Sequence, residues 1–158
     1  MLKKSWKTIL IWILASEAVG FLAGILSRSG MRAYEETALQ PPLSPPMWLF
    51  PVVWAILYAL MGIGAGLVFL QPPSQGRSRS LNLMIAQLVI NFFWPLIFFN
   101  LQAYGLSLVW LILLWVLVLL MILQMRRVLP LAAWLQVPYL LWLTFALYLN
   151  AGVWYLNR

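Results

Sequence analysis

The sequence predicts an all-α membrane protein, a bundle of five transmembrane helices that forms a single domain over residues 1–158. Hydrophobic residues make up 65% of the chain and charged residues only 8%, whereas soluble domains carry about 25% charged residues. The charges gather at the ends of long apolar runs. A helix needs about 20 apolar residues to cross a bilayer, and these runs are long enough to be such spans.

Stretches without any charge set the number of spans. Residues 37–76, 80–125 and 128–157 contain no charged side chain. As one helix, the stretch 80–125 would be about 69 Å long, while the hydrocarbon core is about 30 Å thick. It must therefore fold back, and the polar segment 100–105 (Asn-Leu-Gln-Ala-Tyr-Gly) is the place to do so. The predicted helices cover residues 7–27, 47–70, 81–99, 105–125 and 130–155.

The basic residues predict the orientation of the bundle. With five spans, the N-terminus, the loop at 71–80 and the turn at 126–129 lie on one side, and they hold most of the Lys and Arg residues. Basic loops favour the cytoplasmic side. This pattern predicts an N-terminus in the cytoplasm and a C-terminus outside, and it argues against a nucleic-acid partner because the basic side chains never form a stripe.

The missing residue types exclude several kinds of chemistry. The chain has no Cys and no His, and its three acidic residues are all Glu. Disulfides, Ser-His-Asp triads and ordinary zinc sites are therefore excluded. We expect no metal site and no required cofactor. Glu17 alone lies inside a span, where an acid either couples proton movement or sits protonated or paired in a helix seam. We favour the seam, because Ser16, Gly20 and Gly24 allow close helix packing beside it.

The segment 28–46 is long for a connection in so small a bundle. It contains Tyr34 and the proline-rich run 40–46 (Gln-Pro-Pro-Leu-Ser-Pro-Pro). Long loops in compact domains are often functional lids, and prolines stiffen the chain. The sequence predicts an extramembrane lid over one mouth of the bundle; the alternative is a simple solvated connector.

Two amides and several aromatic side chains mark the faces that look into the bundle. Gln87, Asn91 and Trp94 are spaced i, i+4 and i+7, so they share one helical face. An amide that faced lipid would leave its polar groups unpaired. Two interpretations remain: the amides bind a neighbouring helix, which we favour on spacing alone, or they line a cavity and hold the polar edge of a ligand.

The second and fifth predicted helices each carry an aromatic stripe as well. Trp54 and Tyr58 are four residues apart, which is about one helical turn. Trp142 and Ala146 have the same spacing, and Phe145 lies between them in the sequence. A buried indole N–H requires a partner, which indicates that Trp54 and Trp142 point inward. We expect the stripes of three helices to converge on one internal chamber.

Four motifs, in order along the chain, resemble those of the translocator protein family, also called tryptophan-rich sensory proteins. They comprise Tyr34, Pro41 and Pro45-Pro46; Phe50-Pro51, Trp54 and Tyr58; Gln87, Asn91, Trp94-Pro95 and Phe98-Phe99; and Pro138-Tyr139, Trp142, Phe145-Ala146 and Leu149-Asn150. The resemblance covers residues 34–158. The chain departs from it at Ala33, Gln40 and Leu147, where family members commonly have Trp, Lys and Thr.

The resemblance implies a five-helix bundle, usually a homodimer, with a pocket beneath its first long loop. It implies an integral membrane receptor, a sensor or regulator, that binds protoporphyrin IX, haem-type tetrapyrroles, sterols or drug-like molecules. Its ligand-binding residues here would be Tyr34, Pro45, Trp54, Gln87, Asn91, Trp94, Trp142, Phe145 and Ala146. Two alternatives stay open: a porphyrin or sterol transporter, and an enzyme that degrades protoporphyrin IX in light and oxygen with Trp54 and Trp142 as catalytic residues.

The residues themselves suit such a ligand. A tetrapyrrole is a large apolar plate with acidic edges, which fits aromatic walls, a few amides and a basic loop end such as Arg28 or Arg32. Without His or Cys, we expect no strong axial bond to a haem iron.

Overall fold

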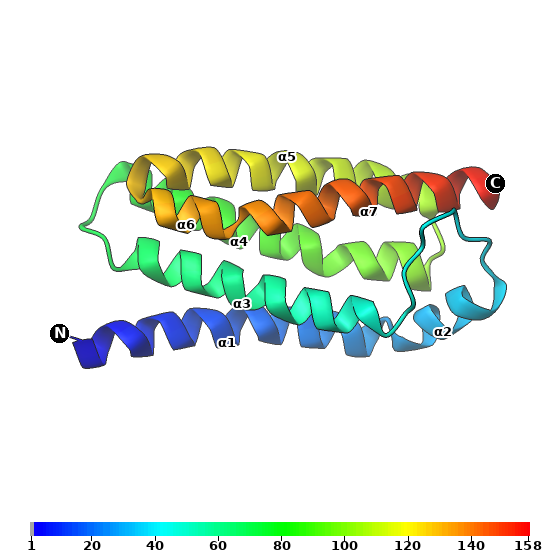
Figure 1. The fold of residues 1–158 in the computed structure, drawn as a ribbon, viewed down its shortest axis with the longest axis horizontal. Helices are drawn as coiled ribbons and strands as arrows, with labels where there is room; N and C mark the ends of the chain where they lie inside the picture. Colours follow the sequence, from blue (N-terminus) through cyan, green and yellow to red (C-terminus); the bar gives the residue numbers. More distant parts are fainter. Residues whose placement is uncertain (1) are drawn as a thin grey trace.

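The computed structural model describes the backbone of residues 2–158 and the side chains of residues 4–158. Five of its segments are long and apolar enough to cross a membrane, and they lie alongside one another as an elongated bundle (Figure 1). The elements are α1 (Leu2–Leu26), α2 (Arg28–Thr37), α3 (Leu49–Phe69), α4 (Gln75–Pro95), the π-helix η1 (Leu96–Asn100), α5 (Tyr104–Val128), α6 (Pro130–Leu135) and α7 (Val137–Leu156). The predicted all-α, five-span architecture is confirmed.

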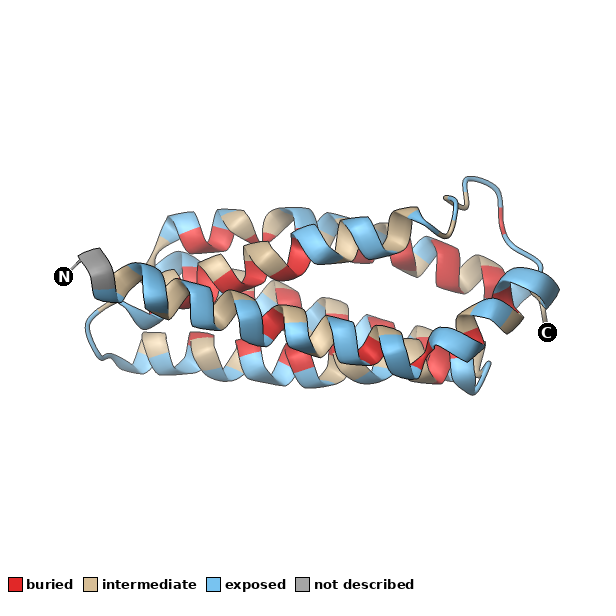
Figure 2. Cartoon of the chain, turned by 90° about the horizontal axis from the view of Figure 1, so that it is seen from below, coloured by how far each residue is buried: buried red, intermediate tan, exposed pale blue. Residues whose placement is uncertain are grey.

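The packing order around the bundle differs from the order along the chain. α1 packs most closely on α3, α4 on α5, and α5 on both α6 and α7. Figure 2 shows buried residues on the inward faces of the helices and exposed residues on the outward faces. Large apolar side chains such as Phe21, Val109 and Leu141 are exposed on the outside, which is the arrangement expected where lipid is the solvent.

Glycines bring α1 and α3 close together. A Cβ at Gly62 would meet the Ile13 backbone, and one at Gly66 would meet Ile9. A Cβ at Gly20 would overlap the Tyr58 ring. These positions therefore serve packing within the monomer, whereas Gly24 has no atom within 4 Å of its missing Cβ.

The predicted loop at 28–46 is wrong in its first half, because residues 28–37 form the helix α2. This helix buries Gly30 and Tyr34, one turn apart, against the end of the third span. A Cβ at Gly30 would collide with Asn100 and the Phe99 backbone. Only residues 38–48 are irregular, and we call them the lid segment.

Two prolines disturb the spans. Pro95 lacks an N–H for the regular helical bond, and the chain continues after it as the π-helix η1. Pro138, in the first turn of α7, also lacks an N–H for the regular helical bond. The span predicted as one helix over 130–155 is consequently two, α6 and α7, which meet at Gln136. The Gln136 side chain donates to the carbonyl of Leu60 at 3.1 Å.

The remaining boundaries move in both directions: α1 begins at Leu2 rather than 7, whereas α3, at Leu49–Phe69, is shorter than its predicted range 47–70. The third span begins at Gln75 rather than 81, because the Ser74 hydroxyl caps it by accepting from the Arg77 N–H at 3.1 Å. The predicted break at 100–105 is confirmed, although the irregular part is only 101–103. Gln102 adopts a positive φ of 50° there.

Candidate functional site

A chain of buried hydrogen bonds joins three spans at the centre of the bundle. Tyr58 of α3 donates its hydroxyl to Asn91 Oδ1 of α4 at 2.7 Å. Asn91 Nδ2 donates to the Tyr139 hydroxyl of α7 at 2.6 Å, and Tyr139 donates in turn to Gln87 Oε1 at 2.7 Å. All four side chains are at least 95% buried. We call these residues the polar network.

The Nε2 group of Gln87 donates only to weak hydrogen-bond acceptors. This nitrogen lies 3.3 Å from the sulfur of Met84 and 3.5 Å from that of Met61, and a thioether is a weak acceptor. The network therefore holds one donor group that a stronger acceptor would attract.

Aromatic rings lie beside the polar network. Trp54 is 5.6 Å from Tyr58 and 6.1 Å from Tyr139 between ring centroids. Trp142 lies 5.9 Å from Phe50 and 5.6 Å from Phe145. Both indoles are only half-buried and pack against the main core, so they form a wall between the network and the outside.

This wall stands where α3 and α7 separate. α3 packs against α6 at the end of the bundle opposite α2, but it makes few close approaches to α7. The two helices diverge toward the end that carries α2 (Figure 1). The lid segment, cyan in that view, runs from α2 past the C-terminal end of α7 and back to the start of α3, across the divergence.

A second aromatic cluster lies under α2. Tyr34 is 5.3 Å from both Phe98 and Phe99, and Trp94 stacks on Phe98 at 5.0 Å. The Trp94 indole donates to Asn150 Oδ1 at 3.1 Å. Burial, with a smaller effect of nearby Tyr104, raises the pKa of the Tyr34 phenol to about 12.

The structure brings the predicted site residues together in groups. Trp54, Gln87 and Asn91 meet around Tyr139, and Trp142 and Phe145 pair beside them. Tyr34 and Trp94 belong to the cluster under α2. Two members stand apart: Ala146 is buried in the main core, and Pro45 is a half-buried residue of the lid segment.

Sequence reasoning did not place Tyr58 and Tyr139 among the site residues, although they connect the amides. The signal that could have found them is the same one used for the indoles, because a buried tyrosine hydroxyl also requires a partner. In this structure the amides bind neighbouring helices, as the packing interpretation predicted.

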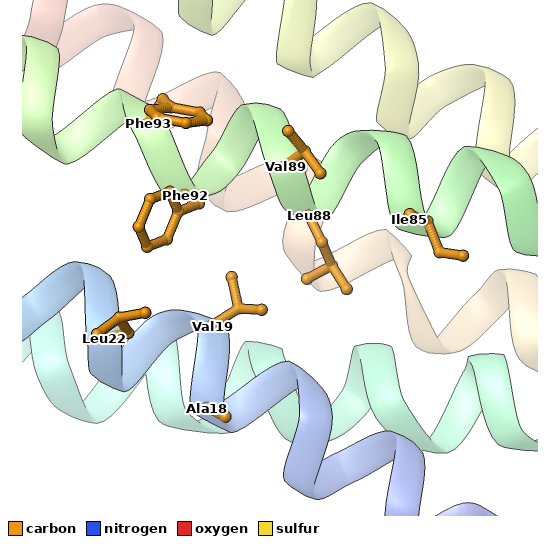
Figure 3. Close-up of a pocket in the computed structure, with 8 residues that line it drawn as sticks. All are labelled: Ala18, Val19, Leu22, Ile85, Leu88, Val89, Phe92 and Phe93. Atoms are coloured by element: carbon orange, nitrogen blue, oxygen red, sulfur yellow. The ribbon is translucent and has the colours of Figure 1, made fainter.

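A separate groove opens on the outside of the bundle between α1 and α4 (Figure 3). Its volume is about 420 Å³. Its lining is hydrocarbon throughout, with Val19 and Leu22 on one side and Val89 and Phe92 on the other. The groove has no side chain that could hold a polar edge, so it is not the site that the amides and indoles form.

One ionisable side chain lies near the polar network: Glu17 of α1 interacts electrostatically with Tyr58, and its buried Oε1 has no hydrogen-bond partner among the described residues. Arg28 and Arg32 are exposed on α2, at the lid end. Among the described residues, no group of three or more His, Cys, Asp or Glu side chains could hold a metal ion. The chemistry available at the network is thus hydrogen bonding by amides and phenols next to aromatic surfaces.

Comparison with known proteins decides the family. The model of the TspO/MBR family matches residues 12–156. The chain belongs to the TspO/MBR family. A tryptophan-rich protein TspO of Chlorobaculum tepidum is 36% identical over 89% of both chains. The translocator protein of Ovis aries is 33% identical over 97% of this chain and 92% of its own.

A third relative, protein CrtK of Rhodobacter capsulatus, is 33% identical over 93% of this chain and 91% of its own length. The family match includes all four motifs that carried the resemblance. This TspO/MBR family member is accordingly an integral, multi-pass membrane protein of the sensor and translocator type.

Proposed function

We propose that the protein is a membrane receptor that binds porphyrins, such as protoporphyrin IX and haem-type tetrapyrroles, between α3, α4 and α7. Sterols and drug-like molecules are further candidate ligands of the same site. The observation that carries the proposal is the pair of half-buried indoles at the divergence of α3 and α7. Trp54 lies against Tyr58 and Tyr139 of the polar network, and Trp142 lies against Phe50 and Phe145.

The arrangement supports such a ligand in two ways. Half-buried indoles offer flat apolar surface to a ring system, and the Gln87 amide can exchange its weak sulfur contacts for a carboxylate. The exposed guanidinium groups of Arg28 and Arg32 stand near the same end of the bundle. Acidic propionate edges would be held by these cations or by the amide.

Titration of the detergent-solubilised protein with protoporphyrin IX, followed by quenching of Trp fluorescence, tests the proposal. We expect saturable binding that Trp142→Ala weakens at least about fivefold, because an aromatic contact contributes about 1 kcal/mol beyond its area. Trp6→Ala is the matched control, since Trp6 is 53% exposed at the other end of the bundle. Equal affinity in all three proteins would refute the site.

The same experiment tests the enzyme alternative, which one observation favours. Trp54 lies against two hydrogen-bonded tyrosines, which are oxidisable neighbours for a light-excited porphyrin. Illumination in air should then cause loss of porphyrin absorbance that Trp54→Phe and Trp142→Phe abolish. Loss that survives both substitutions would remove these residues from the chemistry, and gradient-driven uptake into liposomes would indicate transport.

We further propose an N-terminus in the cytoplasm and a homodimer in the membrane. The orientation is supported by the basic side chains at the end of the bundle opposite the lid segment: Lys4, Lys7, Arg77, Arg79, Arg126 and Arg127. The side chain of Lys3, which the charge pattern also includes, lies outside the described part. The dimer rests on the family resemblance, and light scattering of the detergent complex tests it.

A further inference from the structure

The lid segment is attached to α7 by three successive contacts, two along the helix at Tyr148 and Gly152 and one at Asn157, just past its C-terminal end. Asn157 accepts from the Leu39 N–H at 2.9 Å and donates to the Leu39 carbonyl at 2.8 Å. Pro41 lies on Gly152, where a Cβ would come within 2.6 Å of the proline ring. The Tyr148 hydroxyl donates to the Pro42 carbonyl at 2.7 Å.

These contacts place residues 39–42 along the helix in the antiparallel sense. Three steps of extended chain cover about 10 Å, and the helix from residue 148 to 157 covers about 13.5 Å, so the two lengths are similar. The Asn157 amide hydrogen-bonds both the N–H and the carbonyl of Leu39, as the backbone of a neighbouring β-strand would. The segment needs this support because prolines 41, 42, 45 and 46 have no N–H to offer.

Tyr148 also connects the lid segment with the aromatic wall of the proposed site. Its ring stacks on Phe145 with centroids 6.2 Å apart and planes at 28°. Phe145 in turn contacts Trp142, at 5.6 Å. A row of three rings on α7 therefore leads from the Pro42 carbonyl to Trp142.

We propose that Asn157 and Tyr148 are positioning residues that latch the lid segment to α7 and thereby control how fast a ligand enters and leaves. The inference rests on the proposed function for the identity of the ligand, but the latch itself is a property of the unliganded protein. A ligand that reaches Trp142 past the divergence of α3 and α7 must pass the segment that Asn157 and Tyr148 hold.

Hydrogen–deuterium exchange of the ligand-free protein tests the latch directly. We expect Asn157→Leu to raise the exchange rate of a peptide covering 38–48 about tenfold, while the melting temperature stays near that of the wild type. Asn100→Leu is the matched control, because Asn100 is an exposed amide at the same end that bonds the Leu26 carbonyl instead of the lid segment. Unchanged exchange in Asn157→Leu would overturn the latch.

Stopped-flow quenching with protoporphyrin IX tests the control of ligand exchange. Asn157→Leu and Tyr148→Phe should each raise the association and dissociation rate constants together, by about threefold to tenfold, with a much smaller change in affinity. Tyr155→Phe is the control for Tyr148→Phe, since Tyr155 is a tyrosine of α7 that is 63% exposed and stacks with Arg158. Asn157→Asp keeps the acceptor but loses the donor, and its rates should fall between those of wild type and Asn157→Leu.

The outcomes separate the latch from the proposed function. If the wild type binds no porphyrin, the proposed function fails, and the exchange experiment alone decides whether the latch exists. If porphyrin binds but its rates are the same in wild type and Asn157→Leu, the latch does not control ligand exchange and the inference is wrong.

Discussion

Asn91 is the residue on which the polar network depends, because it bonds one tyrosine on each side. In Asn91→Leu, Tyr139 still donates to Gln87, but the Tyr58 hydroxyl loses its acceptor. An unsatisfied buried hydroxyl costs about 1–3 kcal/mol, and we expect a loss of stability of that size in thermal unfolding. Adding Tyr58→Phe removes the orphaned hydroxyl and should restore part of the loss; a further loss of the same size would contradict the argument.

Gly20 and Gly24 offer a matched pair on α1. Gly20→Ala would drive a Cβ into the Tyr58 ring, whereas Gly24→Ala meets no atom within 4 Å. Alanine favours a helix over glycine by about 1 kcal/mol. We therefore expect Gly24→Ala to leave the melting temperature equal or higher and Gly20→Ala to lower it. Similar effects of the two substitutions would show that Gly20 does not determine the packing of Tyr58.

At residue scale, the sequence predicted which faces point inward but not which atoms bond. The spacing of Gln87, Asn91 and Trp94 placed them on one face, and the structure has all three hydrogen-bonded inside the bundle. Apart from Met84 of α4 itself, their partners come from other helices, and helix spacing carries no information on the rotation of a neighbouring helix. Tyr139 could be recognised from sequence as a hydroxyl in need of a partner, but pairing it with Gln87 and Asn91, and Asn150 with Trp94, requires that rotation.

At the scale of elements, α2 is stable only in its tertiary context. Tyr34 docks it on Phe98 and Phe99, and burial raises the pKa of Tyr34 to about 12. Between pH 10 and 12 an undocked phenol loses its proton while the docked one keeps it, so the docking weakens as pH rises through this range. The difference in absorbance near 295 nm between wild type and Tyr34→Phe should show a phenolate that forms near pH 12. Ionisation near pH 10 would mean that the ring is solvated.

The sequence did not predict α2 because the segment is short and polar and contains a glycine. Gly30 is unfavourable in an isolated helix, and it becomes an advantage only where η1 approaches it closely. The break at Gln136 has a similar origin: Pro138 signalled an irregularity, but its position depends on the contact between Gln136 and Leu60. The long spans were predictable because the bilayer requires their length and apolarity whatever their neighbours are.

For the molecule as a whole, the two ends have different tasks. At one end α3 packs on α6, and Arg77 Nε donates to the Phe69 carbonyl at 3.0 Å, which holds the turn between α3 and α4. At the other end α3 and α7 diverge, and the space between them is spanned by a proline-rich segment and filled by aromatic rings. The proposed latch therefore acts at the end where α3 and α7 are not packed together, away from the contact of α3 with α6.

The orientation of these two ends in the membrane has a direct test, because the chain contains no Cys. Glu36→Cys lies at the lid end and Gln75→Cys at the opposite, basic end, and both side chains are exposed. Basic side chains are retained on the cytoplasmic face, so a membrane-impermeant maleimide should label Glu36→Cys in intact cells and Gln75→Cys only after permeabilisation. Labelling in the reverse order would place the lid segment, and with it the entrance to the proposed site, in the cytoplasm.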